Sequence, residues 1–373
     1  METGDVEKAK SGYPAPRRLS VVVPFHRNLG QLRQCLDAVR RAGRALTGPA
    51  ELAELIVVAD GAQDDPRQVV REAGGRLLAI EGPRGPAVAR NRGVDIASGD
   101  LVVFVDTDVI AGEQAFERMV QALAAEPSAS AVFGAYDEDP ADPAFLSQCR
   151  NLGHCFVHQR SSREAVTFWA GLGAIRRDAF QAVGGYDERF RRPSVEDIDL
   201  GYRINQAGYR IILDPTIQGK HLKRWTFRSS MIMDVRDRGI PWTQLMHRYG
   251  GMRNDLNVTF KYRACVVVAY LLVACLVGAW WWPVLLAGVA VALVILWFLD
   301  LSFYRFFATR RSLGFALAWF PFHVLHHLTN GVSFALGTSI WLGQRLGLNL
   351  PGAVPSGPWA RPRQADLPSA GGH

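Results

Sequence analysis

Residues 101–108 read LVVFVDTD, an apolar run followed by two acidic residues. Its five leading apolar residues, rich in valine, are typical of a strand that is buried on both faces. Strands of this kind occur mainly in parallel sheets that helices cover from both sides. Asp106 and Asp108 follow the strand directly. Their carboxylates should therefore leave the carboxyl edge of the sheet, where ligands of open α/β sheets bind.

Three similar apolar runs precede this strand and alternate with helical patterns. The runs are LSVVVP at 19–24, LIVVAD at 55–60 and RLLAI at 76–80, and the helical stretches are 29–45, 65–73 and 86–97. Such alternation predicts an α/β domain with a Rossmann-like, mostly parallel sheet. Residues 130–228 are less regular, and we interpret them as the second half of the same domain.

Composition limits the classes of partner. The chain has 373 residues, a formal net charge of +7 and 49% hydrophobic residues. A basic balance suits an anionic substrate or an anionic membrane surface. No basic run is interleaved with aromatic residues, so a nucleic-acid partner is not expected. The five cysteines are scattered and form no C-x-x-C pair, which argues against a disulfide framework or a structural zinc site.

The two acids after the strand are candidates for a divalent-metal site. The carboxylates of Asp106 and Asp108 are hard oxygen ligands that suit Mg²⁺ or Mn²⁺, with diphosphate oxygens completing the shell. An ion held there would stabilise a departing diphosphate. An acidic turn without a ligand is the alternative, because Asp is common in turns.

Two further segments offer groups for a nucleotide donor. GPAVARNRG at 85–93 could begin a helix whose N-terminus faces a phosphate, with Arg90 or Arg92 balancing charge. A capped surface helix is the alternative for this segment. Asp60 could accept hydrogen bonds from a base or a ribose, or it could lie in a plain Asp-Gly turn.

Three segments of the less regular half add polar and aromatic candidates. EDID at 196–199 places a possible general base at the start of a predicted helix, although acids also favour a helix N-terminus by charge alone. HLKRW at 221–225 offers a metal ligand, two cations and an aromatic platform for a sugar, or a basic patch beside a membrane. His154 and His158 could share a helix face, but no third metal ligand is evident, so an acceptor-pocket or core role is expected.

A long uncharged stretch predicts membrane insertion. No charged residue occurs between Arg263 and Asp300, and one helical span needs about 20 apolar residues. Tryptophans and a proline at 280–283 favour a turn at the headgroup level. We therefore predict a transmembrane hairpin over 263–299, with a buried soluble helix pair as the alternative.

The remaining C-terminal segments are interpreted relative to this hairpin. A second uncharged stretch predicts a transmembrane segment over 313–344. The basic loop at 300–312 should be cytoplasmic, because positive charge marks that side. Residues 229–262 read as interfacial or linker helices. No signal peptide is recognised, so we expect a multi-pass protein of the cell membrane with a cytoplasmic catalytic domain and disordered tails at 1–18 and 345–373.

Three histidines of the second stretch, His323, His326 and His327, resemble one box of a membrane di-iron enzyme. Such enzymes need several boxes to fill their coordination spheres, and the sequence contains no other. We interpret these histidines as polar packing or acceptor contact within a helix bundle.

The order of the motifs resembles that of family 2 glycosyltransferases. The matching segments are VVVPFHR at 21–27, VVADGAQDD at 57–65, GPAVARNRG at 85–93, DTD at 106–108, GGYDERF at 184–190, VEDIDLGYR at 195–203 and HLKRW at 221–225. The resemblance covers about residues 19–228 and implies the GT-A fold. It also implies an inverting, Mg²⁺- or Mn²⁺-dependent transfer of a sugar from a nucleotide diphosphate donor to a polar or lipid-linked acceptor.

The resemblance implies roles for individual residues. Asp197 is the expected catalytic base, with Glu196 beside it. The expected donor-binding residues are Pro24, Phe25, Asp60, Arg90, Asn91, Asp106 and Arg224. The expected acceptor-binding residues are Trp169, Gly171 and Trp225, and the expected metal ligands are Asp106, Asp108 and His221. Two positions depart from the family pattern: Ala59 stands where many members have Asp, and His221 replaces the Gln of the Q-x-x-R-W box of processive members.

Two other functions are weighed against this one. A GT-A-fold nucleotidyltransferase would need a triphosphate-binding loop rich in glycine and lysine near the first strand, and FHRNLG at 25–30 does not provide one. A membrane scaffold with a catalytically inactive domain would not need both acidic motifs, which are intact here.

Overall fold

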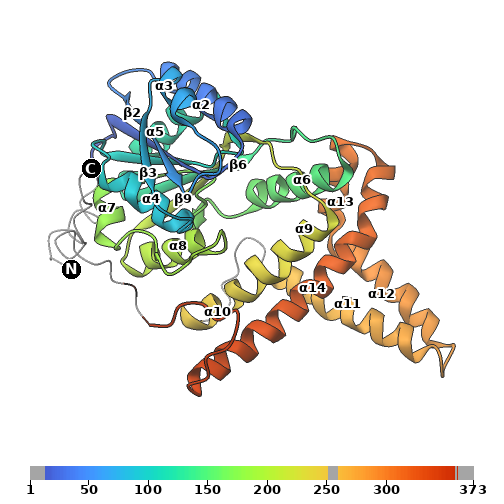
Figure 1. The fold of residues 1–373 in the computed structure, drawn as a ribbon. Helices are drawn as coiled ribbons and strands as arrows, with labels where there is room; N and C mark the ends of the chain where they lie inside the picture. The colour runs from blue at the N-terminus through green and yellow to red at the C-terminus, as the bar shows by residue number, and fades with distance from the viewer. Residues whose placement is uncertain (1–12, 251–258, 358, 360–373) are drawn as a thin grey trace.

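The computed structural model describes residues 13–250, 259–357 and 359. These residues form an α/β domain followed by an arm of C-terminal helices (Figure 1). The tails predicted at 1–18 and 345–373 lie largely outside the described residues. Where the N-terminal segment is described, it packs on the domain, since the Tyr13 N–H donates to the Pro127 carbonyl at 2.8 Å.

The described part of the chain builds one nine-stranded sheet with the order β3-β2-β1-β4-β8-β6-β9-β5, and β7 pairs with β9. The strands are β1 Arg18–Phe25, β2 Glu51–Asp60, β3 Arg76–Ile80, β4 Leu101–Val105, β5 Val109–Ala111, β6 Ala129–Tyr136, β7 Glu164–Ala165, β8 Leu172–Arg176 and β9 Arg210–His221. The four strands predicted from apolar runs are β1 to β4, and the structure confirms them.

The sheet is mixed, but most of its strands run in one direction, as predicted, since β6 runs in the same direction as β4 and is parallel to β9. Strands β3, β2, β1 and β4 are parallel, as predicted. Strand β8 then runs antiparallel to both β4 and β6, and β5 and β7 run antiparallel to β9. Strand β8 pairs with β4 in the opposite direction through five buried residues. Adjacent strands far apart in sequence set this geometry, and no local pattern reports it.

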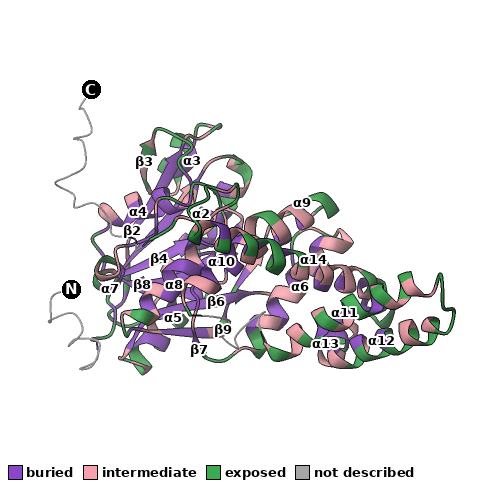
Figure 2. Ribbon diagram, turned by 90° about the horizontal axis from the view of Figure 1, so that it is seen from below, coloured by how far each residue is buried: buried purple, intermediate pink, exposed green. Residues whose placement is uncertain are grey.

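Helices cover both faces of the sheet, as the apolar strands predicted. The helices of the domain are α2 Leu29–Arg44, α3 Arg67–Glu72, α4 Pro86–Asp95, α5 Ala115–Ala125, α6 Phe145–Arg160, α7 Arg177–Ala182 and α8 Glu196–Gln206. Side chains alternate along β1, so Val21 and Val23 join a core with α2 and α5. Val22 between them joins a second core with α4, α7 and α8. Figure 2 shows the resulting buried sheet between partly exposed helices.

The C-terminal arm begins after β9 and projects from the domain (Figure 1). Its elements are α9 Phe227–Ile232, the π-helix η1 Met233–Gly239, α10 Ile240–Arg248, α11 Phe260–Gly278, α12 Leu285–Leu299, α13 Leu301–Arg310 and α14 Leu313–Arg345. Helices α11 and α12 pack together through small and apolar residues. The tryptophans of the turn between them, Trp280 to Trp282, are 64% to 86% exposed.

One described helix, α11, is by itself long and apolar enough to cross a membrane. Helices α12 and α13 would meet the same test only together, and they are bent by 66° where they join. Helix α14 is continuous over 33 residues and contains Pro321. The structure thus provides one candidate span, or two if the bent pair counts as one.

Residues 301–310, expected as part of a cytoplasmic loop, form helix α13 instead. Four aromatic residues of this helix are buried against α6 and α14: Phe303, Tyr304, Phe306 and Phe307. The basic residues suggested a loop, but these aromatic side chains stabilise a helix by packing. The arm is thereby attached to the domain through α6.

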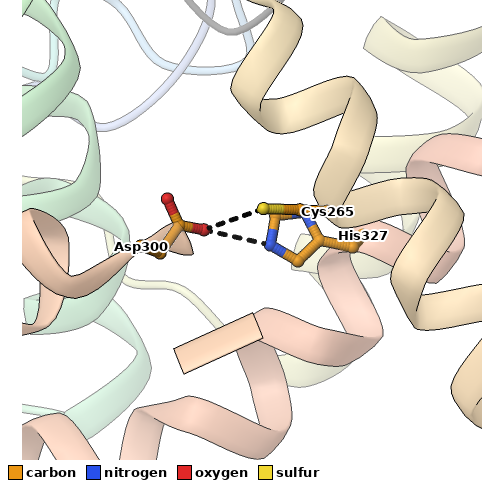
Figure 3. A group of neighbouring side chains, drawn as sticks. All are labelled: Cys265, Asp300 and His327. Atoms are coloured by element: carbon orange, nitrogen blue, oxygen red, sulfur yellow. Dashed lines mark hydrogen bonds and ion pairs between the residues drawn. The ribbon is translucent and has the colours of Figure 1, made fainter. Parts of the chain in front are cut away.

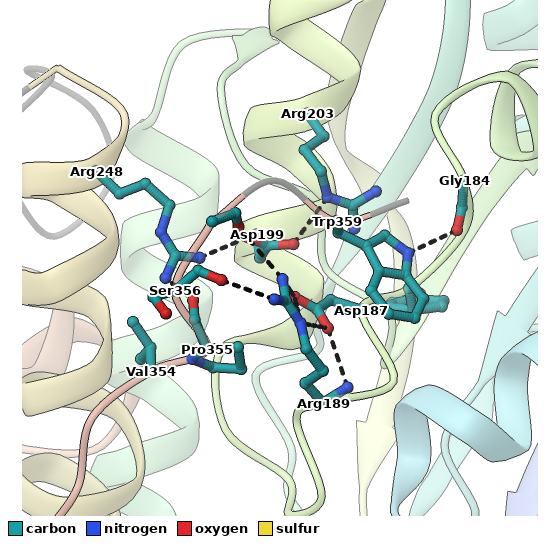
Figure 4. A network of polar contacts seen from close by, with 12 residues as sticks. Gly184, Asp187, Arg189, Asp199, Arg203, Arg248, Val354, Pro355, Ser356 and Trp359 are labelled. Carbon is teal, nitrogen blue, oxygen red and sulfur yellow. Dashed lines mark hydrogen bonds and ion pairs between the residues drawn. The ribbon is translucent and has the colours of Figure 1, made fainter. Parts of the chain in front are cut away.

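The last described segment returns to the domain, although it falls within the predicted C-terminal tail (Figure 4). The Val354 N–H donates to Gln244 Oε1 at 2.9 Å. Arg189 donates to the Ser356 carbonyl at 2.8 Å, and the Trp359 indole N–H donates to the Gly184 carbonyl at 2.8 Å. This segment therefore braces the loop that leads into α8.

Candidate active site

The first part of the site forms where β1 and β4 end side by side. The Thr107 hydroxyl donates to the Pro24 carbonyl at 2.5 Å, and the Asp106 N–H donates to the Gly171 carbonyl at 3.1 Å. These bonds fix the D-x-D backbone between the ends of β1 and β8. The side chains of Asp106 and Asp108 remain 32% and 31% exposed, so both can reach a ligand.

Arg90 connects the two acidic motifs. Its guanidinium donates to Asp106 Oδ1 at 2.7 Å and to Glu196 Oε1 at 3.0 Å. Burial works against its charge, but Asp106 above all, with Glu196, raises the pKa of Arg90 above its usual range. Because Arg90 is only 4% exposed, it holds the metal-binding and the catalytic candidates together from within the protein.

Asp197 lies in the first turn of α8, next to Glu196. One of its carboxylate oxygens accepts from the Ile198 N–H at 2.8 Å, and the other faces the Ala170 N–H at 3.4 Å. Burial and the Glu196 charge raise the pKa of Asp197 to about 7, against the opposing charges of Arg90 and Arg238. A carboxylate with this pKa suits proton abstraction near neutral pH.

His221 ends β9 beside Asp108, with Nε2 3.5 Å from Asp108 Oδ2. Burial disfavours the charged form of Asp108, but the hydrogen bond and charge of His221 hold its pKa below its usual range. Among the described residues, however, ligand atoms of Asp106, Asp108 and His221 do not all come within 4.8 Å of one another. The three residues offer a divalent ion an open site that needs further ligands from a substrate.

An aromatic group lies beside these acids. Tyr136 stacks on His221 with ring centroids 4.1 Å apart, and Trp169 meets Tyr136 edge-on at 4.8 Å. Gly171 lies against the Trp169 indole ring. A Cβ at this position would come within 2.5 Å of the ring, so the close approach requires glycine. The structure thus brings together two of the three expected acceptor residues.

His154 and His158 belong to the inner side of this aromatic group. Their rings lie 5.1 Å and 5.5 Å from Trp169, and His158 Nδ1 lies 2.9 Å from the Gly134 carbonyl. Burial lowers the pKa of His158 to about 4 and that of His154 well below its usual range. Both rings are therefore neutral at physiological pH, which agrees with a role in packing or acceptor contact.

Trp225, the third expected acceptor residue, is positioned by cations. The Arg150 guanidinium carbon lies 4.9 Å and Lys223 Nζ lies 4.2 Å from its ring centroid. The Trp225 backbone N–H donates to the Ser147 hydroxyl at 2.8 Å. Arg224, expected to bind the donor, is exposed. Lys223, in contrast, interacts electrostatically with the acids. Burial lowers the pKa of Lys223, and the charges of Asp108 and Asp106 oppose this shift.

Three expected donor-binding residues have structural roles here. Phe25 is 1% exposed and belongs to the core under α2, so it has no surface to offer a donor. Asn91 is fully buried, and its amide exchanges hydrogen bonds with the Tyr186 backbone at 2.8 Å and 2.9 Å. The Asp60 carboxylate accepts from the backbone N–H groups of Arg84 and Gly85, both at 2.7 Å. Phe25 and Asn91 were expected to contact the donor, and their burial shows that this expectation is wrong. Asp60 shapes the loop that precedes α4.

Arg238 is a residue that the sequence patterns did not single out. It lies on the π-helix η1, where its guanidinium carbon is 5.3 Å from the Trp242 ring centroid. Burial lowers its pKa, and the charge of Asp197 opposes this shift. A π-helix is a feature frequent at functional sites, and the sequence signal was only a dense run of charges at 234–238.

A mixed α/β sheet with two acidic motifs at one edge is the arrangement of the GT-A fold. Residues 20–184 match the family model "Glycosyl transferase family 2", and residues 151–224 match the "N-terminal domain of galactosyltransferase". The chain carries a family 2 glycosyltransferase domain.

Curated relatives and a solved structure agree with this assignment. Validoxylamine A glucosyltransferase of Streptomyces hygroscopicus subsp. jinggangensis is 31% identical over 222 residues, which cover 51% of this chain and 52% of that protein. Succinoglycan biosynthesis protein ExoA of Rhizobium meliloti is 27% identical over 64% of this chain and 70% of its own. This chain spans about half the length of the first of these relatives.

Among solved structures, the mannosyltransferase PcManGT from Pyrobaculum calidifontis shares the fold with a TM-score of 0.51 and 18% identity. The match covers 91% of this chain and 94% of that one. At this identity the likeness concerns the fold alone.

Proposed function

We propose that this protein transfers a sugar from a nucleotide diphosphate donor to an acceptor hydroxyl with inversion at the anomeric carbon. The observation that carries the proposal is the Arg90 bridge, with 2.7 Å to Asp106 and 3.0 Å to Glu196. It brings the D-x-D acids and the start of α8 to one edge of the sheet, where donor and acceptor can meet. Both acidic motifs belong to the family 2 domain or follow it directly.

Asp197 is the proposed general base. Its pKa of about 7 leaves it largely ionised in mildly alkaline solution, while it still binds a proton strongly enough to take one from a hydroxyl. The acceptor oxygen attacks the anomeric carbon as Asp197 receives its proton, and the bond to the nucleotide diphosphate breaks. A single displacement of this kind needs no protein nucleophile.

A divalent ion fits the donor side of the site. Asp106 and Asp108 are partly exposed carboxylates on a backbone held by β1 and β8, and His221 lies beside Asp108. Mg²⁺ or Mn²⁺ bound there would neutralise charge on the leaving diphosphate. The PcManGT structure holds GDP-mannose and Mn²⁺, which supports a divalent ion here. Lys223 and Arg238 supply further positive charge near the same edge.

The acceptor is proposed to lie against the aromatic group beside α8. Trp169 and Trp225 present ring faces and edges of the kind that carry sugar rings by apolar contact. Gly171 leaves room for Trp169 in its present position. A polar or lipid-linked acceptor would thus meet Asp197 from the side of the helical arm.

We further propose that α11 and α12 insert into a membrane as a hairpin and that the catalytic domain stays cytoplasmic. The support is the exposed apolar surface of α11, where Val267 is 59% and Leu271 is 56% exposed. Exposed apolar patches of this extent mark membrane or protein contacts. Helix α14, which packs on α10 and η1, is proposed as the second membrane-associated segment.

A donor screen tests the proposal. The purified full chain is incubated with nucleotide diphosphate sugars, Mn²⁺ and lipid extract, and release of nucleotide diphosphate is measured. The expected result is release with at least one donor, lost by a factor of about 10³ or more in Asp197→Asn, while donor binding by calorimetry persists. Pyrophosphate release from a nucleoside triphosphate would show a nucleotidyltransferase instead, and failure to bind any nucleotide diphosphate with Mn²⁺ would show an inactive scaffold.

A further inference from the structure

Three segments of the helical arm bring metal-ligating side chains to one buried point (Figure 3). Cys265 lies on α11, Asp300 lies between α12 and α13, and His327 lies on α14. Their ligand atoms all lie within 4.8 Å of one another. The three residues are 0% to 2% exposed, so water does not compete for these atoms.

The distances in this cluster are those of ligands around one ion. Asp300 Oδ2 lies 3.3 Å from His327 Nε2 and 3.6 Å from Cys265 Sγ. In a tetrahedral zinc site, bonds of about 2.0 Å to N or O and about 2.3 Å to S place neighbouring ligands roughly 3.3 Å and 3.5 Å apart. The Cys265 thiol donates to the same Asp300 oxygen that His327 Nε2 faces, and a bound ion would take the place of these two contacts.

A second histidine, His323, lies next to this group. His323, one helical turn before His327, places Nε2 3.8 Å from Asp300 Oδ2. Its other ring nitrogen, Nδ1, lies 2.8 Å from the Tyr304 hydroxyl. A partner on Nδ1 is what orients a histidine whose Nε2 faces a metal.

The second oxygen of Asp300 is held separately. Lys261 Nζ lies 2.8 Å from Asp300 Oδ1, which leaves Oδ2 to face the cysteine and the histidines. Lys261 is 33% exposed, so its charge stays at the rim. A thiolate and a carboxylate would together neutralise a divalent ion in this buried position.

We propose that Cys265, Asp300 and His327, with His323 at the open position, bind a structural Zn²⁺ ion. Sulfur, nitrogen and oxygen ligands in a buried tetrahedral group select zinc over Mg²⁺ or Mn²⁺. The scattered cysteines argued against a zinc site at the level of sequence. The fold supplies one by joining α11, the α12–α13 junction and α14, and the ion would lock these helices at the end of the hairpin that adjoins the domain.

This site is independent of the proposed catalytic ion and does not rest on the proposed function. Cobalt is the probe, because Co²⁺ replaces Zn²⁺ and reports a thiolate ligand by a charge-transfer band in the near ultraviolet. The purified full chain in detergent is stripped with a chelator and titrated with Co²⁺. The expected result is a saturable band at one Co²⁺ per chain, which Zn²⁺ abolishes and Mg²⁺ does not.

Variants assign the site. Cys265→Ala and His327→Ala should each remove the band or weaken Co²⁺ binding by about 10²-fold or more. Cys275→Ala, on the same helix, and Asp108→Asn, at the catalytic site, should leave the band unchanged. A full chain that binds Co²⁺ without the band, or a Cys265→Ala chain that keeps it, would overturn the proposal. The titration of the unaltered chain decides the matter even where a variant fails to fold.

Discussion

At the scale of single residues, Asp197 lies between opposing charges. Glu196 is its neighbour in the first turn of α8, and Arg90 and Arg238 approach from α4 and η1. Burial and, after it, the charge of Glu196 outweigh the two arginines and raise the pKa of Asp197 to about 7. A carboxylate with a raised pKa is expected at a catalytic site. The raised pKa lowers the stability of the folded protein, but it also makes the carboxylate a stronger base.

Asp197→Asn should therefore stabilise the protein in alkaline solution. A raised pKa contributes stability that is complete below the unfolded value of about 3.9 and is lost as pH rises through the folded value. The neutral amide avoids this loss. We expect Asp197→Asn to exceed the unaltered protein in unfolding free energy by on the order of 2 kcal/mol at pH 8, and to show little gain at pH 4. Thermal unfolding in detergent at the two pH values measures the difference, and a destabilised variant at pH 8 would contradict it.

The rate of transfer should follow the ionisation of Asp197. Only the deprotonated form accepts a proton, so kcat/KM for the acceptor should rise about tenfold per pH unit on the acid side and level off above about pH 7. Glu196→Gln removes the neighbouring charge and should move this midpoint to lower pH. Steady-state rates from pH 5 to 9 with saturating donor and Mn²⁺ test both points. An identical midpoint in the Glu196→Gln variant would show that Asp197 is not the titrating base.

At the scale of secondary-structure elements, Asp234 joins three helices. It lies on η1, accepts from Arg150 of α6 at 2.6 Å and lies 3.1 Å from His326 Nδ1 of α14. Burial opposes its charge, but His326 and Arg150 hold the pKa of Asp234 well below its usual range. Since Arg150 also stacks on Trp225, this junction connects the arm to the acceptor side of the site.

Asp234→Asn should weaken the junction. Loss of the charge leaves Arg150 partly buried without its partner, at a cost on the order of 3 kcal/mol. The depressed pKa contributes stability above the unfolded value and loses it in acid, so the penalty should shrink below about pH 4. Thermal unfolding as a function of pH measures it. Asp237→Asn is the matched control, because its partner Arg236 is 60% exposed and the pair should contribute little. Equal effects of the two substitutions would contradict a stabilising role of the Asp234 junction.

The elements also show how far local pattern reaches. The apolar runs at 19–24, 55–60, 76–80 and 101–106 correspond to β1 to β4, because burial on both faces needs continuous apolar residues. The antiparallel β8 was not predictable, since its direction depends on pairing with β4 and β6. Helix α13 was expected as a loop, because its arginines are visible in the sequence and the partners of its aromatic residues are not.

Some residues of the candidate site could be predicted from the sequence, and others could not. The order of motifs indicated Asp106, Asp108 and Asp197, and the structure brings their segments to one edge. The sequence motifs could not show that Phe25 and Asn91 face inward. Neighbouring residues on a strand or a helix point in different directions, and a motif does not indicate which of them face the ligand. Arg238, and the meeting of Cys265 with Asp300 and His327, arise from helix packing alone.

At the scale of the whole molecule, a catalytic domain stands beside an apolar helical arm. Figures 1 and 2 show α11 and α12 projecting from the domain with exposed residues along both helices. In a protein that stays in water, this apolar surface would be exposed to solvent. The arm and the acceptor side of the site are also connected through η1, which suits an acceptor that reaches the enzyme from a membrane.

The full chain should therefore sediment with membranes and resist extraction by high salt. Two carboxylates in α11, Val267→Asp and Leu271→Asp, should shift it toward the soluble fraction, because each charge near the centre of a span costs about 2.5–3.5 kcal/mol. Fractionation with detection by immunoblot measures the shift. Gln34→Asp and Arg41→Asp, exposed on α2, control for added charge. A full chain found in the soluble fraction without detergent would refute the proposed anchor.

The central claim is that Asp106, Asp108 and Asp197, distant in sequence, surround one bound nucleotide diphosphate sugar. An anomalous-diffraction map from crystals grown with Mn²⁺ and UDP or GDP tests it most directly. The account predicts a manganese peak bonded to an Asp108 or Asp106 oxygen and to the diphosphate, with the Asp197 carboxylate facing the same ligand. A manganese peak and nucleotide bound elsewhere on the domain, or with Asp197 on the opposite side of the ligand-binding edge, would contradict it.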